Sequence, residues 1–309
     1  ADLTQPGGPL PPQRPLLLAP MIGVIEPCIL PAASTQQPAS LQKQCNPAEG
    51  SAAALVESTL KELAPHAKTL ENWELGYTLP VPLLQLFQEQ NGAWQIDAAR
   101  VNQLARTVRD SERPVVVYLF ATHFASHAPL AQTLAADPRN LAPTREGPMP
   151  AGTYYGEPVY YWNIADREAP VNLRRRQAAA AMVNALCALE PQHRSKIRAV
   201  TLLGEVHHYF PDFEQGMGFG SPYRVTDYSP ASRAGFRDFL RTRFNTLEAL
   251  NQAVGGHYAA WDAIDPPSKD IRTEPLAHFN EHIDSYAQGV LPVSGWAFRA
   301  HRAPGSHAQ

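Results

Sequence analysis

The chain has 309 residues, of which 44% are hydrophobic and 18% charged, and its formal net charge is −3. This composition is typical of a folded globular protein and excludes an intrinsically disordered chain. The small negative charge provides no basic surface for nucleic acid, and no apolar run reaches the length of about 18 residues that a membrane span needs.

The chain begins Ala1-Asp2-Leu3 without a methionine, as a mature protein does after removal of a signal peptide. A trimmed chain would begin in the same way. We expect a secreted or periplasmic protein. Residues 1–14 are rich in Pro, Gly and Gln, which predicts a flexible arm.

Three cysteines are present. Cys28 and Cys45 flank a Pro/Ser/Gln-rich loop, and a disulfide between them would stabilise the fold by about 3 kcal/mol. Two free thiols are the alternative. Cys187 ends an apolar helical run, where we expect a buried core thiol.

Apolar strands alternate with amphipathic helices along the chain. Buried strands are predicted at Leu16–Ile25, Val115–Phe120 and Ile197–Gly204. A short strand that carries Trp73 and Glu74 is predicted at Thr69–Tyr77. Helices are predicted at 51–66, 97–112, 171–189, 232–244 and 246–254, with Asp97 as the N-cap of the second. A long loop is predicted from about Thr122 to Pro170.

This alternation predicts an α/β fold with a parallel sheet. No Gly-rich phosphate fingerprint follows any strand, which disfavours a nucleotide-binding open sheet and favours a (β/α) TIM-barrel-like domain. We assign the barrel to residues 15–288. Only four strands are evident where a closed barrel needs eight, so we expect a barrel that is incomplete or very irregular in its second half. Residues 289–309 are interpreted as the start of a C-terminal β-sandwich module or as a tail.

Chemistry in a (β/α) barrel lies at the carboxyl ends of the strands. Glu205 directly follows the apolar strand and Gly204, where desolvation would raise the pKa of its carboxyl as a general acid requires. We therefore take Glu205 as the catalytic candidate. The other residues predicted to line the cleft and bind substrate are Trp73, Glu74, His123, Trp162, His207, His208, Tyr209, Asp227 and Tyr228.

A general acid such as Glu205 could serve glycoside hydrolysis, which needs a second carboxyl. The sequence leaves the identity of that second carboxyl open. The candidates are Glu74, Asp212, Glu214 and Asp227. The histidines at positions 123, 127, 207 and 208 raise a metal alternative, yet no HExxH or CxxC pattern is present. His207 and His208 are adjacent and would point to opposite sides of an extended segment, so we expect no metal and no cofactor.

Several segments carry a family resemblance: Thr201-Leu-Leu-Gly-Glu205, Gly92-Ala-Trp-Gln-Ile-Asp97, residues 234–256 (AGFRDFLRTRFNTLEALNQAVGG) and residues 257–267 (HYAAWDAIDPP). They resemble the β-galactosidase-like branch of the large retaining clan of (β/α)8-barrel glycoside hydrolases. The resemblance implies a polysaccharide or oligosaccharide substrate and makes Glu205 the general acid/base that ends the fourth strand. That clan usually has Asn before this glutamate, whereas this chain has Gly204, and its nucleophilic glutamate has no counterpart that we can locate. Val290–Phe298 resembles the start of an immunoglobulin-like module that accompanies polysaccharide-handling enzymes.

The leading hypothesis is a secreted or periplasmic glycoside hydrolase-like protein with Glu205 as general acid/base. The alternative is a non-catalytic glycan-binding or exopolysaccharide-assembly protein on a degenerate barrel. A metal-dependent hydrolase or deacetylase is the third hypothesis, and it rests on the histidines alone.

Overall fold

The computed structural model describes residues 15–22, 43–44, 46–64, 72–120, 129–154, 157–164, 166–204 and 227–266. The chain divides into two compact units. The first unit comprises residues 1–131 and 174–206, and the second comprises residues 132–173 and 207–309. The predicted arm at 1–14 and the predicted β-rich module at 289–309 lie outside the described residues.

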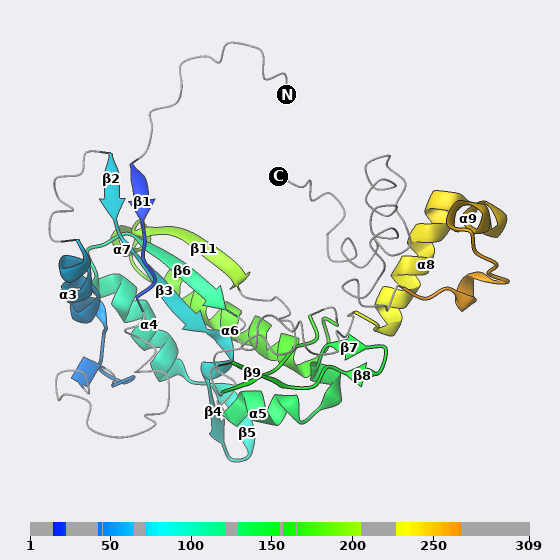
Figure 1. Ribbon diagram of the computed structural model, residues 1–309. Helices are drawn as coiled ribbons and strands as arrows, with labels where there is room; N and C mark the ends of the chain where they lie inside the picture. The colour runs from blue at the N-terminus through cyan, green and yellow to red at the C-terminus, as the bar shows by residue number, and fades with distance from the viewer. Residues whose placement is uncertain are drawn as a thin grey trace, which may run out of the picture. The chain divides into compact units, whose positions relative to one another are not determined.

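The first unit is built on a parallel sheet of three strands in the order β11-β6-β3 (Figure 1). The strands are β3 (Tyr77–Pro82), β6 (Val115–Phe120) and β11 (Ile197–Gly204). The predicted strands β6 and β11 are confirmed. The central strand β6 is largely buried, as predicted. The prediction that β11 is buried is wrong for its described side chains, which are exposed or half-buried, with Val200 40% exposed, because β11 is an outer strand of this three-stranded sheet.

The register aligns the ends of these three strands. Tyr77, Val115 and Ile197 are paired at one end, which we call the amino edge. Pro82, Phe120 and Gly204 are paired at the other end, which we call the carboxyl edge.

Two N-terminal strand predictions are wrong in their details. In the described part of the run from Leu16 to Ile25, residues 16–22, the short strand β1 (Leu16–Leu18) pairs in parallel with β2 (Trp73–Leu75), and Leu16 is 57% exposed. A single parallel bridge from Met21 to Thr78 connects this segment to β3. Gly76 separates β2 from β3, and a Cβ there would lie 2.2 Å from the Pro114 carbonyl oxygen, so this close approach requires glycine.

Helices α3 (Ala53–Leu63) and α4 (Ala98–Asp110) confirm the next two predictions. The Asp97 carboxylate accepts a hydrogen bond from the Arg100 N–H at 3.1 Å, which makes it the N-cap of α4 as predicted. Between β3 and α4, the sequence also forms a hairpin that was not predicted, β4 (Phe87–Gln90) and β5 (Ala93–Ile96). Its turn is Asn91-Gly92, with φ values of 52° and 75°.

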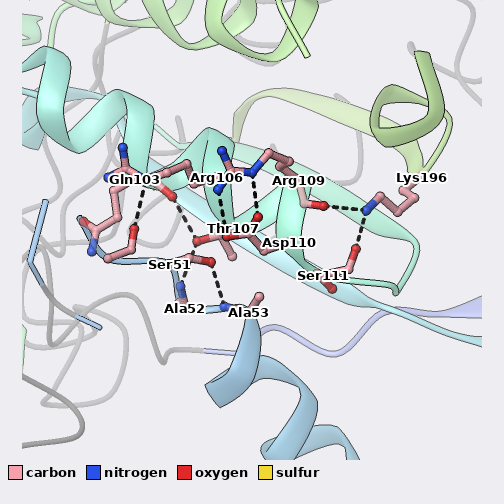
Figure 2. A network of polar contacts seen from close by, with 11 residues as sticks. Ser51, Ala52, Ala53, Gln103, Arg106, Thr107, Arg109, Asp110, Ser111 and Lys196 are labelled. Atoms are coloured by element: carbon pink, nitrogen blue, oxygen red, sulfur yellow. Dashed lines mark hydrogen bonds and ion pairs between the residues drawn. The ribbon is translucent and has the colours of Figure 1, made fainter. Parts of the chain in front are cut away.

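A network of polar contacts joins α4 to the segments around it (Figure 2). The buried Thr107 hydroxyl accepts a hydrogen bond from the Ala52 N–H at 3.1 Å and donates to the Gln103 carbonyl at 3.0 Å. At the end of α4, the Lys196 ammonium donates to the carbonyls of Arg109 at 2.9 Å and Ser111 at 2.5 Å. These bonds satisfy backbone groups and attach the start of β11 to α4.

Helix α6 (Pro170–Cys187) and the short helix α7 (Pro191–Arg194) connect β6 to β11. Because β6 and β11 are parallel, the connection between them returns the chain from the end of β6 to the start of β11. The helix prediction is confirmed. The prediction for Cys187 is wrong, since its thiol lies exposed at the end of α6.

The second unit corrects the prediction of a long loop from Thr122 to Pro170. This region contains helix α5 (Pro129–Ala135), the 3₁₀ turn η4 (Pro138–Asn140) and two hairpins. The hairpin strands are β7 (Pro143–Thr144), β8 (Gly147–Pro148), β9 (Gly152–Tyr154) and β10 (Glu157–Val159). A small hydrophobic core in this region consists of Ala142, Met149, Val159 and Tyr161.

The last described part of the second unit is a helical pair, α8 (Pro230–Phe244) and α9 (Leu247–Val254), followed by η6 (Trp261–Ala263). It confirms both helix predictions. Phe236, Leu240, Leu250 and Ile264 form its core. Gly255 ends α9 in the left-handed conformation, with φ of 62°, as helix C-caps favour.

The described strands do not close into a barrel. A closed barrel of this type needs eight parallel strands, and the largest sheet among the described residues has three. The mixed α/β class is as predicted, and the closed TIM barrel is not seen in this part of the chain. No helix within the described ranges has the length and apolar character to cross a membrane.

Candidate functional site

The carboxyl edge of the three-stranded sheet is the candidate site. Gly204 at the end of β11 is paired with Phe120, which is in turn paired with Pro82. Glu205 is the next residue after Gly204 in the sequence and lies outside the described residues. The candidate general acid/base thus follows directly from a strand whose end is aligned with those of its neighbours.

The segment that follows β3 at this edge is well packed. The 3₁₀ turn η3 (Leu83–Gln85) begins immediately after Pro82, and Leu83, Leu84 and Gln85 are all buried. The Arg100 guanidinium donates to the Gln85 carbonyl at 2.9 Å, which ties η3 to the start of α4. The Gln85 side chain is 5% exposed, and its Oε1 accepts no hydrogen bond in the structure.

Contacts of α6 place its second turn at the same edge. The Arg174 guanidinium lies over the Phe87 ring at 5.5 Å and donates to the Trp94 carbonyl at 3.1 Å. Phe87 and Trp94 belong to the hairpin that follows η3. These contacts agree with the position that the parallel topology requires for the beginning of the helix.

Arg175, the next residue on α6, is 3% exposed. Burial lowers the pKa of its guanidinium to about 10, because a charged group loses the solvation that water would provide. The group still carries its positive charge at neutral pH. Arg175 is therefore a buried cation next to Arg174 on α6.

Trp73 and Glu74 lie at the other edge of the sheet. Both belong to β2, which precedes β3, and the Glu74 carboxylate pairs with the Arg198 guanidinium at 2.9 Å near the start of β11. Six residues of strand, about 20 Å, separate Arg198 from Gly204. Trp73 and Glu74 therefore precede the sheet strand β3 and do not stand at the carboxyl edge. Their predicted role in binding substrate stays a prediction.

The remaining described candidates belong to the second unit and are engaged in packing or capping. Trp162 is 6% exposed, and its ring lies 5.4 Å from that of Tyr160. The Asp227 carboxylate accepts hydrogen bonds from the hydroxyls of Ser229 and Ser232 at 3.0 and 2.6 Å, at the start of α8. The Tyr228 hydroxyl, which is buried, donates to the Pro266 carbonyl.

Other predicted residues lie outside the described ranges. They are His123, His127, His207, His208, Tyr209, Asp212 and Glu214, together with the proposed disulfide partners Cys28 and Cys45. Within the described ranges, no three His, Cys, Asp or Glu side chains gather as metal ligands would.

Gln85 and Arg175 are the residues at the carboxyl edge that the sequence analysis missed. The signal for Arg175 was present, since it occupies the same helical stripe as the buried Ala178, Met182 and Leu186. An arginine at a core-facing position of an amphipathic helix indicates a functional or paired group. Gln85 is the single polar residue within the otherwise apolar segment 83–87, which is a comparable signal.

Comparison with known protein families and with curated proteins finds no match to this chain. Among solved structures, the chain is similar to a β-galactosidase from Bacillus circulans sp. alkalophilus, with 13% identity and a TM-score of 0.39 over 85% of this chain and 30% of that one. It is also similar to a cold-adapted β-galactosidase from Rahnella sp. R3, with 16% identity and a TM-score of 0.34 over 72% of this chain and 29% of that one. The chain spans less than a third of the length of these enzymes, and the likeness is distant.

Proposed function

We propose that the protein is a glycoside hydrolase-like protein that acts on a polysaccharide or oligosaccharide, with Glu205 as the general acid/base. The observation that carries this proposal is the register of Gly204 with Phe120 and Pro82 at the carboxyl edge. Active sites of (β/α) folds are built from the segments that leave this edge. A secreted or periplasmic location is part of the same proposal and rests on the sequence alone.

The proposed chemistry needs a carboxyl group that is protonated when it meets the substrate. In a cleft that a bound glycan closes, a carboxyl group loses solvation, which favours its protonated form. Such a group can protonate the glycosidic oxygen as the bond breaks, and general acid catalysis of this kind contributes about 10²- to 10⁴-fold. In a retaining mechanism the same group would then remove a proton from the attacking water.

The substitution Glu205→Gln tests this role, with Glu190→Gln as the matched control because Glu190 is an exposed carboxyl beyond the end of α6. We expect Glu205→Gln to lower kcat by about 100- to 10,000-fold while the melting temperature stays within error. Aryl glycosides with acidic leaving groups need little proton donation, so their rates should fall much less. Unchanged turnover of polysaccharide by Glu205→Gln would refute the assignment.

A non-catalytic glycan-binding role is the second candidate. The observation that favours it concerns two candidates for the second catalytic carboxyl. Glu74 lies at the amino edge, and the Asp227 carboxylate accepts hydrogen bonds at the start of α8. Both classes of glycosidase need a second carboxyl within roughly 10 Å of the first. Glycan binding by the wild-type protein without turnover of any aryl glycoside would select this role over hydrolysis.

A further inference from the structure

The turn of the β4–β5 hairpin joins an asparagine directly to a glycine. Asn91 and Gly92 are both exposed, and their φ values of 52° and 75° place both residues in the left-handed region. A Cβ added at Gly92 would meet no other atom within 4 Å, so the turn is open on this side. The side-chain amide of Asn91 is therefore followed by a backbone nitrogen that no side chain shields.

The hairpin holds this turn with few contacts. Within the described residues β4 and β5 form a sheet of two strands, in which Gln90 is paired with Ala93 next to the turn. An isolated two-stranded hairpin is at best marginally stable in water, and such exposed elements are the parts of a protein that open most readily. Local opening lets the backbone of Asn91 rotate, so that its side chain can approach the nitrogen of Gly92.

Other exposed asparagines lack this combination. Asn102 and Asn184 lie within helices α4 and α6, where hydrogen bonds of the helix fix the backbone. The residue after each of them carries a side chain, and Asn91-Gly92 is the only Asn-Gly pair in the sequence. The chain therefore offers matched sites for comparison with Asn91.

We propose that Asn91 is a site of spontaneous deamidation. The Gly92 backbone nitrogen loses its proton to a base in solution and attacks Cγ of Asn91. The new N–Cγ bond closes a cyclic imide, the Cγ–Nδ2 bond breaks, and ammonia leaves with a proton taken from water. Water then opens the ring: addition at Cγ gives aspartate, and addition at the backbone carbonyl of residue 91 gives isoaspartate.

The isoaspartate product changes the backbone of the turn. Its main chain runs through Cγ and is longer by one methylene, whereas the aspartate product adds only a negative charge. The length of a hairpin turn sets the register of its strands, here Gln90 with Ala93 and Glu89 with Trp94. Because the Trp94 carbonyl accepts a hydrogen bond from Arg174 on α6 at 3.1 Å, isoaspartate at the turn should also weaken the contact between the hairpin and this helix.

The test follows the full chain during incubation in mildly alkaline buffer. Peptide mass spectrometry measures deamidation of each asparagine, and labelling by isoaspartate methyltransferase detects the second product. We expect Asn91 to convert several-fold faster than Asn102 and Asn184, at a rate that rises with pH because the attacking nitrogen must lose its proton. Conversion of Asn91 no faster than that of Asn184 overturns the proposal.

Two variants test the chemistry and its consequence. Gly92→Asp places beside the nitrogen a side chain that tolerates the left-handed conformation, and it should slow conversion several-fold; an unchanged rate overturns attack by this nitrogen. Asn91→Asp adds the charge without the methylene, so hydrogen exchange of the β4 and β5 amides should stay as in the wild type. The isolated isoaspartate form should exchange these amides several-fold faster, and wild-type protection in that form overturns the predicted loss of register.

Discussion

Asn140→Ala should destabilise the second unit through two hydrogen bonds at once. The Asn140 side chain is fully buried, its Nδ2 donates to the Leu134 carbonyl at 2.9 Å, and its Oδ1 accepts from the Val171 N–H at 2.8 Å. Val171 lies in the first turn of α6, where N–H groups have no partner within the helix. One side chain therefore joins the end of α5 to the start of α6.

The magnitude follows from what the truncation leaves behind. A buried backbone group that loses its partner costs about 1–3 kcal/mol, so the two groups together cost about 2–6 kcal/mol. Leu134 and Val171 are 7% and 0% exposed, so water reaches neither carbonyl nor N–H without local opening. At 1.4 kcal/mol per factor of ten, even the lower figure corresponds to about 30-fold.

Hydrogen exchange gives the most direct assay, because it resolves this segment from the rest of the chain. We expect amides in the first turn of α6 to exchange about 30-fold faster or more in Asn140→Ala, and the urea midpoint to fall. Asn184→Ala on the exposed side of the same helix is the control and should change neither. Wild-type exchange rates at Val171 in Asn140→Ala would refute the reasoning.

Two further predictions concern the first unit. Asp97→Ala should lower the free energy of unfolding, measured by urea titration, by about 1 kcal/mol because α4 loses its N-cap. Asp97→Asn keeps the acceptor oxygen and should lower the free energy of unfolding much less. Equal decreases in the two variants would mean that the cap hydrogen bond is not the cause. Hydrogen bonds from Arg113 hold the pKa of the Glu57 carboxyl below its ordinary value of 4.5. The ion pair therefore stabilises the folded state fully above pH 4.5, and this stabilisation is lost as the pH falls through the lower pKa of the folded state. Glu57→Gln should therefore be less stable than wild type by about 0.5–1 kcal/mol at pH 7, with the difference vanishing in acid. Glu62→Gln, at an exposed position of the same helix, is the control and should leave the free energy of unfolding at pH 7 unchanged.

Strand β6 was predictable because a central parallel strand covered on both faces needs continuous apolar side chains. The apolar run of β11 also predicted a strand, although its described side chains are exposed or half-buried. Strand β3 was not, since Pro80 and Pro82 argue against a central strand. It is the outer strand of the three, and a strand there can leave N–H groups unpaired. The β4–β5 hairpin carried a signal that was overlooked, because Asn91-Gly92 is the preferred sequence of a tight turn with positive φ.

The site was predicted in part. Alternating strands and helices place chemistry at the carboxyl edge, and that reasoning leads to Glu205 without any coordinates. The same reasoning misplaced Trp73 and Glu74, because the boundary between β2 and β3 depends on the close approach of Gly76 to Pro114. Local sequence patterns contain no information about a contact between residues that are 38 positions apart.

The sequence by itself determined much of the local structure of this protein: the helices, with the N-cap of α4 at Asp97, the strands β6 and β11, and the position of Glu205 after β11. These features depend on propensities and hydrophobic periodicity within a few residues. Only the tertiary structure decided which strand ends are aligned and that Arg175 and Gln85 are buried. It also decided that Glu74 pairs with Arg198, which lies about 20 Å along β11 from Gly204. The reason is physical: register and burial are set by contacts between segments distant in sequence.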